Sequence, residues 1–247
     1  MAASGEADGI IAVELGSALA LFADATASPS GLDDDALAGI AGRAVGRRLG
    51  SSVPVLYAQQ RHGRLVYVYS AAAPLPAGPH SVGDCDALIT GEAGVALTVR
   101  TADCLPVALA GSGVVALVHA GWRGLAADLL GAVLDRLGNE FGATPASVEV
   151  AIGIGVGPCH YPVGPEVIRG LAAHGSEAAW HADGQVDLAA WAAGRLRVLG
   201  VGAERVRVLP GCTACSPSHH SYRRDGVAAR RQWSAVVLTE GLRPATP

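Results

Sequence analysis

Residues 105–119 read LPVALAGSGVVALVH, two apolar runs joined by the turn residues Gly111-Ser112-Gly113. Each run has the length and composition of a β-strand, and the link between them is too short for a crossover helix. Two further apolar runs, 86–90 and 95–99, come before this pair and have similarly short connections. Strands connected in this way pair in antiparallel or mixed order, so we expect a mixed sheet at the centre of the chain.

Helical patterns flank this strand-rich centre. The run after Asp33 begins with acidic residues, has an apolar face and ends in Arg47-Arg48 before Gly50, which are start and stop signals of a helix. Further expected elements are helices at about 125–137, 165–173 and 188–199, strands at 53–58, 64–69, 148–154, 205–209 and 234–238, a weak strand pattern within residues 1–30, and a loop at 71–83. Without repeats or an obvious linker, the pattern predicts a single α+β domain over residues 1–247.

The charge pattern restricts the classes of partner. The formal net charge is −4 and all 18 basic residues are arginine, so we expect neither nucleic acid nor an anionic membrane surface as a partner. The absence of lysine excludes a PLP or Schiff-base lysine and a P-loop lysine. Any anion must be held by guanidinium groups, backbone amides or a metal.

Cysteine usage indicates a reducing compartment. The five cysteines are an odd number with no framework spacing, which favours a cytoplasmic protein. The stretch Ile10–Ala25 resembles a signal peptide only superficially, because it lacks a positive n-region and contains Glu14. No apolar run reaches the roughly 18 residues that a membrane span needs.

Three strong ligand side chains stand at the ends of predicted strands. His62 and Cys104 each follow an apolar run, and His119 ends one. If these ends lie at one rim of a sheet, two imidazoles and a thiolate converge there, a set that suits zinc and leaves a fourth position open for water or substrate. The same residues also allow a Cys104–His119 nucleophilic pair. Taken singly, they have plain alternatives: a solvated loop histidine, an inert buried thiol and a hydrogen-bonded core histidine.

Charged residues near this trio suggest supporting roles. Asp103, in an apolar stretch, needs a partner, and it either orients a ligating imidazole or caps a turn. Arg123 stands just before a predicted helix, and Arg223 and Arg224 lie in a turn, so the three guanidinium groups are candidates for holding phosphate bidentately. An internal Arg224–Asp225 ion pair is the alternative for the last of these.

Two motifs are weak on their own. Cys212-Thr213-Ala214-Cys215 has zinc-knuckle spacing, but no second Cys-x-x-Cys and no matching histidine pair accompanies it in sequence. The glycine-rich run 153–157 follows a strand, yet Pro158-Cys159 interrupts the helix that a dinucleotide fold requires. We expect Cys159-His160 and His219-His220 to be pocket wall rather than ligands.

Taken together, these segments resemble the bacterial laccase-domain family, known first as multicopper polyphenol oxidases and later as zinc-dependent purine nucleoside phosphorylases. The run TADCLP (101–106) with VHAGWRG (118–124) downstream is the most specific part of the resemblance. The other matching stretches are Gln60–Gly63, Asp86–Thr90, Gly155–Gly164, Cys212-Thr213 and Ser221–Gly226. The resemblance implies a four-layer α/β/β/α fold with mixed sheets, and it places the metal ligands at His62, Cys104 and His119.

The resemblance also implies an activity: phosphorolysis of adenosine, inosine, guanosine and methylthioadenosine, together with adenosine deamination. We expect zinc rather than copper as the cofactor, Cys104, His119 and Asp103 in the catalytic centre, and Arg123, Arg223 and Arg224 around phosphate. The chain departs from the family pattern in the N-terminal segment 22–28, at Pro162, at His219-His220 and at Ala228-Ala229-Arg230. The metal trio is intact, while parts of the expected substrate pocket are altered.

Three other functions stay open at this point. A cysteine hydrolase or deamidase would use Cys104 as nucleophile and His119 as base. A copper polyphenol oxidase needs a multi-copper cluster, for which three ligands are too few. A non-enzymatic family member would bind metal or a muropeptide-related ligand and act in cell-wall quality control.

Overall fold

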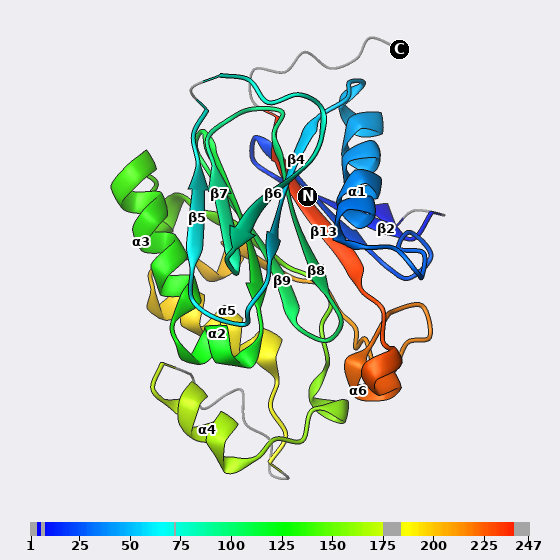
Figure 1. Cartoon of the computed structure of the whole chain (residues 1–247). Coiled ribbons are helices and arrows are strands. Elements are labelled where there is room, and N and C mark those ends of the chain that lie inside the picture. The colour runs from blue at the N-terminus through cyan, green and yellow to red at the C-terminus, as the bar shows by residue number, and fades with distance from the viewer. Residues whose placement is uncertain (1–3, 6–7, 72, 175–183, 240–247) are drawn as a thin grey trace.

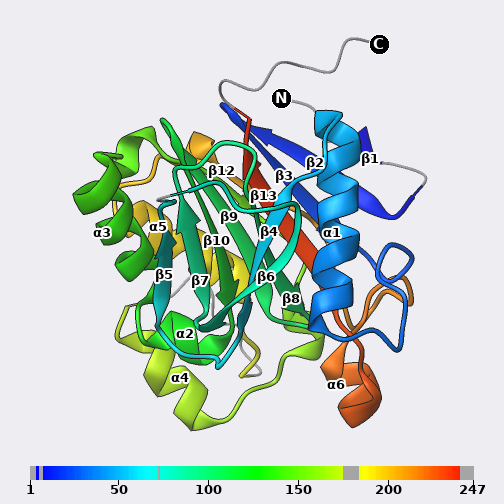
Figure 2. The same cartoon turned by 45° about the horizontal axis from the view of Figure 1, so that its top comes forward.

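The computed structural model describes residues 4–5, 8–71, 73–174 and 184–239, which form four layers in the order helix, sheet, sheet, helix (Figure 1 and Figure 2). Helix α1 (Asp34–Leu49) forms one outer layer, and α3 (Leu129–Phe141) with α5 (Leu188–Val198) forms the other. The predicted four-layer α+β fold with mixed sheets is confirmed.

The first sheet has seven strands and changes from antiparallel to parallel along its width. It runs in the order β1 (Ser4–Gly5), β2 (Ile10–Leu15), β3 (Ala18–Ala23), β13 (Gln232–Leu238), β8 (Ala96–Thr101), β4 (Pro54–Gln59) and β6 (Gly78–Asp84). The first five strands pair antiparallel, whereas β8, β4 and β6 are parallel neighbours. The C-terminal strand β13 therefore lies in the middle of the sheet.

The second sheet has six strands and contains the apolar stretch 105–119. Its order is β12 (Val206–Val208), β11 (Glu149–Ile152), β9 (Leu105–Gly111), β10 (Val114–Ala120), β7 (Ala87–Thr90) and β5 (Val66–Tyr69). The hairpin β9–β10 is antiparallel and pairs His119 with Pro106. The outermost pair on each side is parallel, so this sheet is also mixed.

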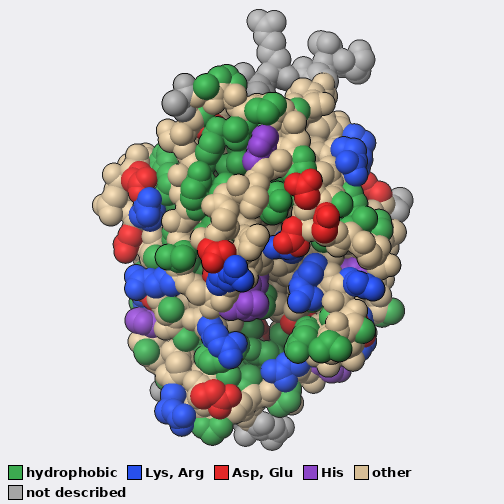
Figure 3. All heavy atoms as spheres, in the orientation of Figure 1, with side chains coloured by type: hydrophobic (Ala, Val, Ile, Leu, Met, Phe, Trp, Pro, Cys, Tyr) green, Lys and Arg blue, Asp and Glu red, His purple; other side chains and the backbone are tan. Residues whose placement is uncertain are grey.

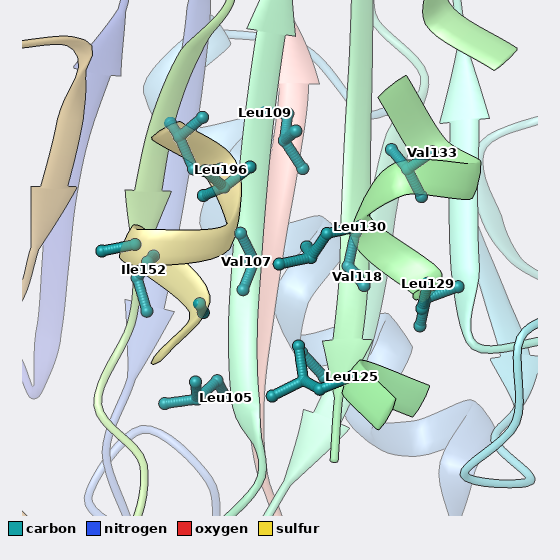
Figure 4. Close-up of a cluster of buried hydrophobic side chains, with 14 of the residues drawn as sticks. Leu105, Val107, Leu109, Val118, Leu125, Leu129, Leu130, Val133, Ile152 and Leu196 are labelled. Carbon is teal, nitrogen blue, oxygen red and sulfur yellow. The ribbon is translucent and has the colours of Figure 1, made fainter. Parts of the chain in front are cut away.

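Apolar side chains fill each of the three spaces between layers. One cluster joins α1 to the seven-stranded sheet, a second lies between the two sheets, and a third joins the six-stranded sheet to the helices. Figure 4 shows the third cluster, where Leu105 and Val107 of β9 and Val118 of β10 face Leu130 and other helix residues. Strands β9 and β10 are buried along their whole length, which explains why their sequence is uniformly apolar.

The predicted helix after Asp33 is confirmed together with both of its caps. The Asp33 side chain accepts a hydrogen bond from the backbone N–H of Ala36 at 2.8 Å, and Gly50 ends the helix in the left-handed conformation, φ 69°. Helices at α4 (Pro165–Ala172) and α5 also agree with the expected ranges. Within the described part of the chain, no helix is both long and apolar enough to cross a membrane.

Two expectations about local structure are wrong. The expected loop at 71–83 contains most of β6, which the Pro- and Gly-rich composition concealed. The helix expected at about 125–137 is two helices, α2 (Trp122–Ala126) and α3, separated by Asp128 at φ 60°. The Asp128 carboxylate accepts two hydrogen bonds from Arg195, at 2.9 and 2.7 Å, and this ion pair holds Asp128 in its left-handed conformation.

Candidate metal centre

His62, Cys104 and His119 lie together at one end of the two sheets. Their donor atoms are all within 4.8 Å of one another, and the two imidazole rings meet edge to face with centroids 4.7 Å apart. His62 lies in the connection from β4 to β5 and Cys104 in that from β8 to β9, while His119 lies on β10. The three residues that the sequence singled out are therefore neighbours in space, with His119 buried and His62 exposed.

The carboxylate of Asp86 organises this group, and the sequence did not reveal its role. Asp86 is buried just before β7 and accepts a hydrogen bond from Nδ1 of His119 at 2.9 Å. It also accepts from the backbone N–H groups of His62 at 2.9 Å, Gly63 at 2.7 Å and Arg61 at 3.3 Å. A carboxylate on Nδ1 fixes the imidazole tautomer and leaves Nε2 of His119 free for a metal ion.

Carboxylate hydrogen bonds hold the backbone of two site residues, His62 and Asp103, in the left-handed region. His62 has φ 59° and Asp103 has φ 85°, conformations that cost roughly 1–3 kcal/mol each in non-glycine residues. The Asp86 carboxylate holds His62 in this conformation by accepting a hydrogen bond from the His62 backbone N–H. Asp103 is fixed by its carboxylate, which accepts from Thr213 Oγ1 at 2.6 Å and from the backbone N–H of Arg223 at 2.6 Å.

The electrostatics of the site favour a thiolate beside protonated imidazole. Burial raises the pKa of Cys104, but hydrogen bonds with His119 and His62 outweigh it and bring this pKa down to about 6. Burial lowers the pKa of His119, and its bonds to Asp86 and Cys104 more than offset this and raise the pKa to about 9. A metal ion would take the place of the proton between these donors, because it binds the thiolate and the neutral imidazole.

Gly121 leaves the space that the ligands occupy. A Cβ atom at this position would lie 3.1 Å from the Cys104 sulfur and 3.2 Å from Cδ2 of His62. Its backbone angles, φ −79° and ψ 162°, suit any residue, so only the space matters here.

We expect Gly121→Ala to weaken metal binding without unfolding the protein. The methyl group must displace two ligands by a few tenths of an ångström, and overpacking of this kind costs about 1 kcal/mol or more, or roughly fivefold in affinity. Competition with a metal indicator measures the affinity. Gly138→Ala is the matched control, because a Cβ atom there has only an ordinary contact at 3.7 Å. Equal metal affinity in both variants would contradict the steric role of Gly121.

A cavity of about 710 Å³ opens over the trio. Figure 3 shows a hollow in this face of the molecule, bordered by arginine and histidine side chains. The lining consists of Gln60, His62, Arg100, Thr101, Ala102, Asp103, Cys104, His119, Trp122, Arg123, Tyr161, Tyr222, Arg223 and Arg231. Its volume is that of a small-molecule site, and guanidinium groups and aromatic rings surround the metal ligands.

Two of the three predicted phosphate arginines lie in this cavity. The guanidinium of Arg123 is over the Trp122 ring at 4.6 Å, and that of Arg223 is over the Tyr161 ring at 4.7 Å. Stacking on a ring holds a guanidinium in place while its N–H groups stay available to an anion. Arg231 also lines the cavity, which the sequence did not indicate.

Arg224 is not among the residues that line the cavity. Its guanidinium forms a two-point ion pair with Asp225, at 2.8 and 2.7 Å. It also donates to the carbonyl oxygens of Thr213, Ser216 and His219 at 2.7–3.1 Å. These contacts occupy the guanidinium, so the geometry favours the internal ion pair that was the alternative for this residue.

Asp103 lines the cavity, but both of its oxygens bind Thr213 and Arg223 rather than an imidazole. The carboxylate therefore connects the Cys104 loop to the segments that carry Thr213 and Arg223. Of the two roles considered for Asp103, the contacts match the positioning of a turn, and Asp86 orients the ligating imidazole.

The histidines and cysteines expected in the pocket wall lie elsewhere. His219 and His220 are not among the cavity residues, and His220 Nε2 is 3.0 Å from the Ser28 carbonyl oxygen. Cys159 and His160 lie beside Cys212 and Cys215 instead. The Cys212–Cys215 pair, which was weak on its own in the sequence, therefore has neighbouring ligand side chains, and these come from a segment more than fifty residues earlier in the chain.

The fold and the rim of two imidazoles and a thiol define a class of four-layer α+β proteins with a candidate metal site at one end of the sheets. The chain belongs to the multi-copper polyphenol oxidoreductase laccase family, which it matches over residues 8–239. This assignment confirms the resemblance seen in the sequence.

Individual relatives are similar over most of their length. A purine nucleoside phosphorylase of Streptomyces coelicolor is 40% identical over 183 residues, which are 71% of this chain and 72% of the relative. Another, of Streptomyces griseus, is 36% identical over 211 residues and 80% of each chain. Among solved structures, YlmD of Geobacillus stearothermophilus has a TM-score of 0.81 and 25% identity, covering 96% of this chain and 99% of its own.

Proposed function

We propose that this protein is a zinc-dependent purine nucleoside phosphorylase that cleaves adenosine, inosine, guanosine or methylthioadenosine with phosphate. One observation carries the proposal: a single cavity contains the His62–Cys104–His119 trio and the ring-stacked guanidinium groups of Arg123 and Arg223. The activity named for the Streptomyces relatives supports the choice of substrate.

The donor set fits zinc better than copper chemistry. Two imidazoles and one thiolate hold a single tetrahedral ion with one open position, and the Asp86 contact gives His119 the orientation of a zinc-ligating histidine. Oxidation of phenols by a multi-copper cluster would need further ligands within the cavity, and among the described residues its lining offers no histidine or cysteine beyond the trio. When bound, zinc would supply Lewis-acid polarisation of a substrate oxygen.

The residues of the chain would divide the remaining work. Arg123 and Arg223 would bind phosphate bidentately and place it against the ribosyl carbon, and their charge would balance the anion as the cation-like transition state develops. Trp122 and Tyr161 position these guanidinium groups. The Asp103 carboxylate keeps Arg223 at the rim by accepting a hydrogen bond from the Arg223 backbone N–H.

Adenosine deamination at the same site is a second proposal with less support. Known zinc deaminases use a carboxylic acid as proton donor and acceptor. The carboxylate in the cavity lining is that of Asp103, and its oxygens already accept from Thr213 and Arg223. Formation of inosine in the assay below tests it directly.

One assay decides among these proposals and their rivals. Purified protein of known zinc content is incubated with adenosine and phosphate, and adenine, inosine and ribose 1-phosphate are quantified. Adenine with equal ribose 1-phosphate supports phosphorolysis, and its loss on chelation, with recovery on adding zinc, supports the cofactor. Turnover that persists without metal would favour the Cys104–His119 nucleophilic pair. No turnover of any nucleoside by zinc-loaded protein would favour a non-enzymatic role, such as binding a muropeptide-related ligand.

We expect Arg123→Ala and Arg223→Ala each to weaken the apparent affinity for phosphate about ten- to hundredfold. The reason is the loss of a charge-assisted contact worth roughly 1.5–3 kcal/mol. Initial rates as a function of phosphate concentration measure the change, and zinc content should stay constant. Arg224→Ala is the control, because it should lower thermal stability and leave the phosphate dependence almost unaltered. An unchanged phosphate dependence in both cavity variants would exclude the arginine clamp.

We also propose a cytoplasmic location for this reaction. All five cysteines are free thiols in the structure, and three of them are partly or fully exposed within one small cluster. Thiols in this arrangement persist in a reducing compartment.

A further inference from the structure

A second group of metal-ligating side chains lies outside the cavity. The knuckle cluster consists of Cys159, His160, Cys212 and Cys215. The first two residues belong to a 3-10 turn (Pro158–His160) between β11 and α4, and the other two come from the loop between β12 and α6 (Tyr222–Asp225). All four donor atoms lie within 4.8 Å of one another.

The separations within the knuckle cluster are those of a tetrahedral ion site. Nδ1 of His160 is 3.3 Å from the Cys159 sulfur, 3.3 Å from that of Cys215 and 3.9 Å from that of Cys212. The sulfurs of Cys159 and Cys215 are 3.4 Å apart. In a tetrahedron with zinc–sulfur bonds of about 2.3 Å and zinc–nitrogen bonds of about 2.0–2.1 Å, neighbouring ligands are roughly 3.5–3.8 Å apart.

Backbone amides already face one of the sulfurs as they would face a thiolate. Cys212 Sγ accepts from the N–H of Gly157 at 3.1 Å and from those of Ala214 and Cys215. Gly157 also keeps the space open, since a Cβ atom there would lie 3.1 Å from Cβ of Cys212 and 3.5 Å from the Cys159 sulfur. The backbone around Gly157 therefore stabilises one thiolate and leaves room for the cysteine side chains that would bind an ion.

We propose that the knuckle cluster is a second metal site, a closed four-ligand zinc site with a structural role. Three thiolates and one imidazole use every position of a tetrahedral ion, whereas the His62–Cys104–His119 trio leaves one position open. Binding forms three zinc–sulfur bonds and one zinc–nitrogen bond, and the protons of the three thiols leave to solvent. The exposure of Cys159, His160 and Cys215 gives the ion a path into the site.

The contacts around the knuckle cluster indicate what the ion would hold together. Between the two cysteines of the loop, Thr213 donates its backbone N–H to Gly155 at 2.9 Å and its hydroxyl to Asp103 at 2.6 Å. The 3-10 turn leads directly into Tyr161, on whose ring Arg223 is stacked. A zinc ion would therefore fix two walls of the cavity to each other from outside, without contributing to the reaction.

The test uses the reduced full-length chain, saturated with zinc, freed of unbound ion and analysed for metal per chain. We expect two ions in the wild type, one in Cys215→Ser, one in Cys104→Ala and none in the double variant. Cys85→Ala is the matched control and should keep two, because Cys85 is a buried thiol outside both sites. Two ions in Cys215→Ser, or one in the wild type together with none in Cys104→Ala, would overturn the proposal.

Cobalt substitution covers the possibility that Cys215→Ser does not fold. Cobalt-loaded Cys104→Ala should keep most of the thiolate-to-cobalt charge-transfer band, since three of the four ligating thiols belong to the knuckle cluster. Absence of that band would overturn the proposal, as would a wild-type protein that, even under reducing conditions, holds a Cys159–Cys215 disulfide and no second ion.

Discussion

Replacing Cys104 with alanine should remove one metal ion per chain and reduce nucleoside phosphorolysis to the uncatalysed background. Cys104 is the only anionic ligand of the trio, so the two remaining imidazoles would bind zinc too weakly to retain it through purification. Metal analysis and the adenosine–phosphate assay on the same sample measure both effects.

The choice of control makes this result specific. Cys85→Ala removes a buried thiol that belongs to neither group of candidate metal ligands, and it should keep the wild-type metal content and activity. If Cys104→Ala lost activity while its metal content stayed at the wild-type level, the thiol would be acting as a nucleophile rather than a ligand.

Asp86→Asn should have the second-largest effect, although Asp86 touches no metal ion itself. The amide cannot accept from all four donors that the carboxylate serves, so the His119 ring and the left-handed turn at His62 both lose their support. We expect metal affinity to fall by about 10- to 100-fold. The free energy of unfolding of the metal-free protein should fall by roughly 3–5 kcal/mol, as it does when a buried charged pair is broken.

Asp128→Asn separates these two effects. It weakens the ion pair between Arg195 and Asp128, itself a left-handed residue, and neither of the two lines the cavity, so it should lower stability while leaving metal affinity intact. Chemical denaturation and metal competition measure the two quantities. Wild-type metal affinity in folded Asp86→Asn would show that the imidazole needs no carboxylate to orient it.

The sequence revealed the fold where one local signal dominated. The runs at 105–110 and 114–118 were recognisable because strands buried on both faces are uniformly apolar. Strand β6, at an edge and half exposed, has a sequence of Gly, Pro and polar residues and looked like a loop. Its place depends on parallel pairing with β4, a long-range contact that no local pattern encodes.

The same contrast applies to the site. His62, Cys104 and His119 were found because strong ligands at strand ends stand out in an apolar sequence. Asp86 was not, since its partners are backbone amides and one imidazole that only the folded chain brings to it. The knuckle cluster was missed for a related reason: its halves are separated by 52 residues between His160 and Cys212, so spacing gave only half of the ligand set.

The placement of His62 and Cys104 has a mechanical consequence. Both lie where the chain passes from the seven-stranded sheet to the six-stranded one, in the β4–β5 and β8–β9 connections. An ion bound there would connect these two segments, which cross from one sheet to the other at the same end of the molecule. Release of the ion would allow the two sheets to separate first at that end. Slow hydrogen exchange of the backbone amides beside the cavity would therefore indicate that the metal is bound.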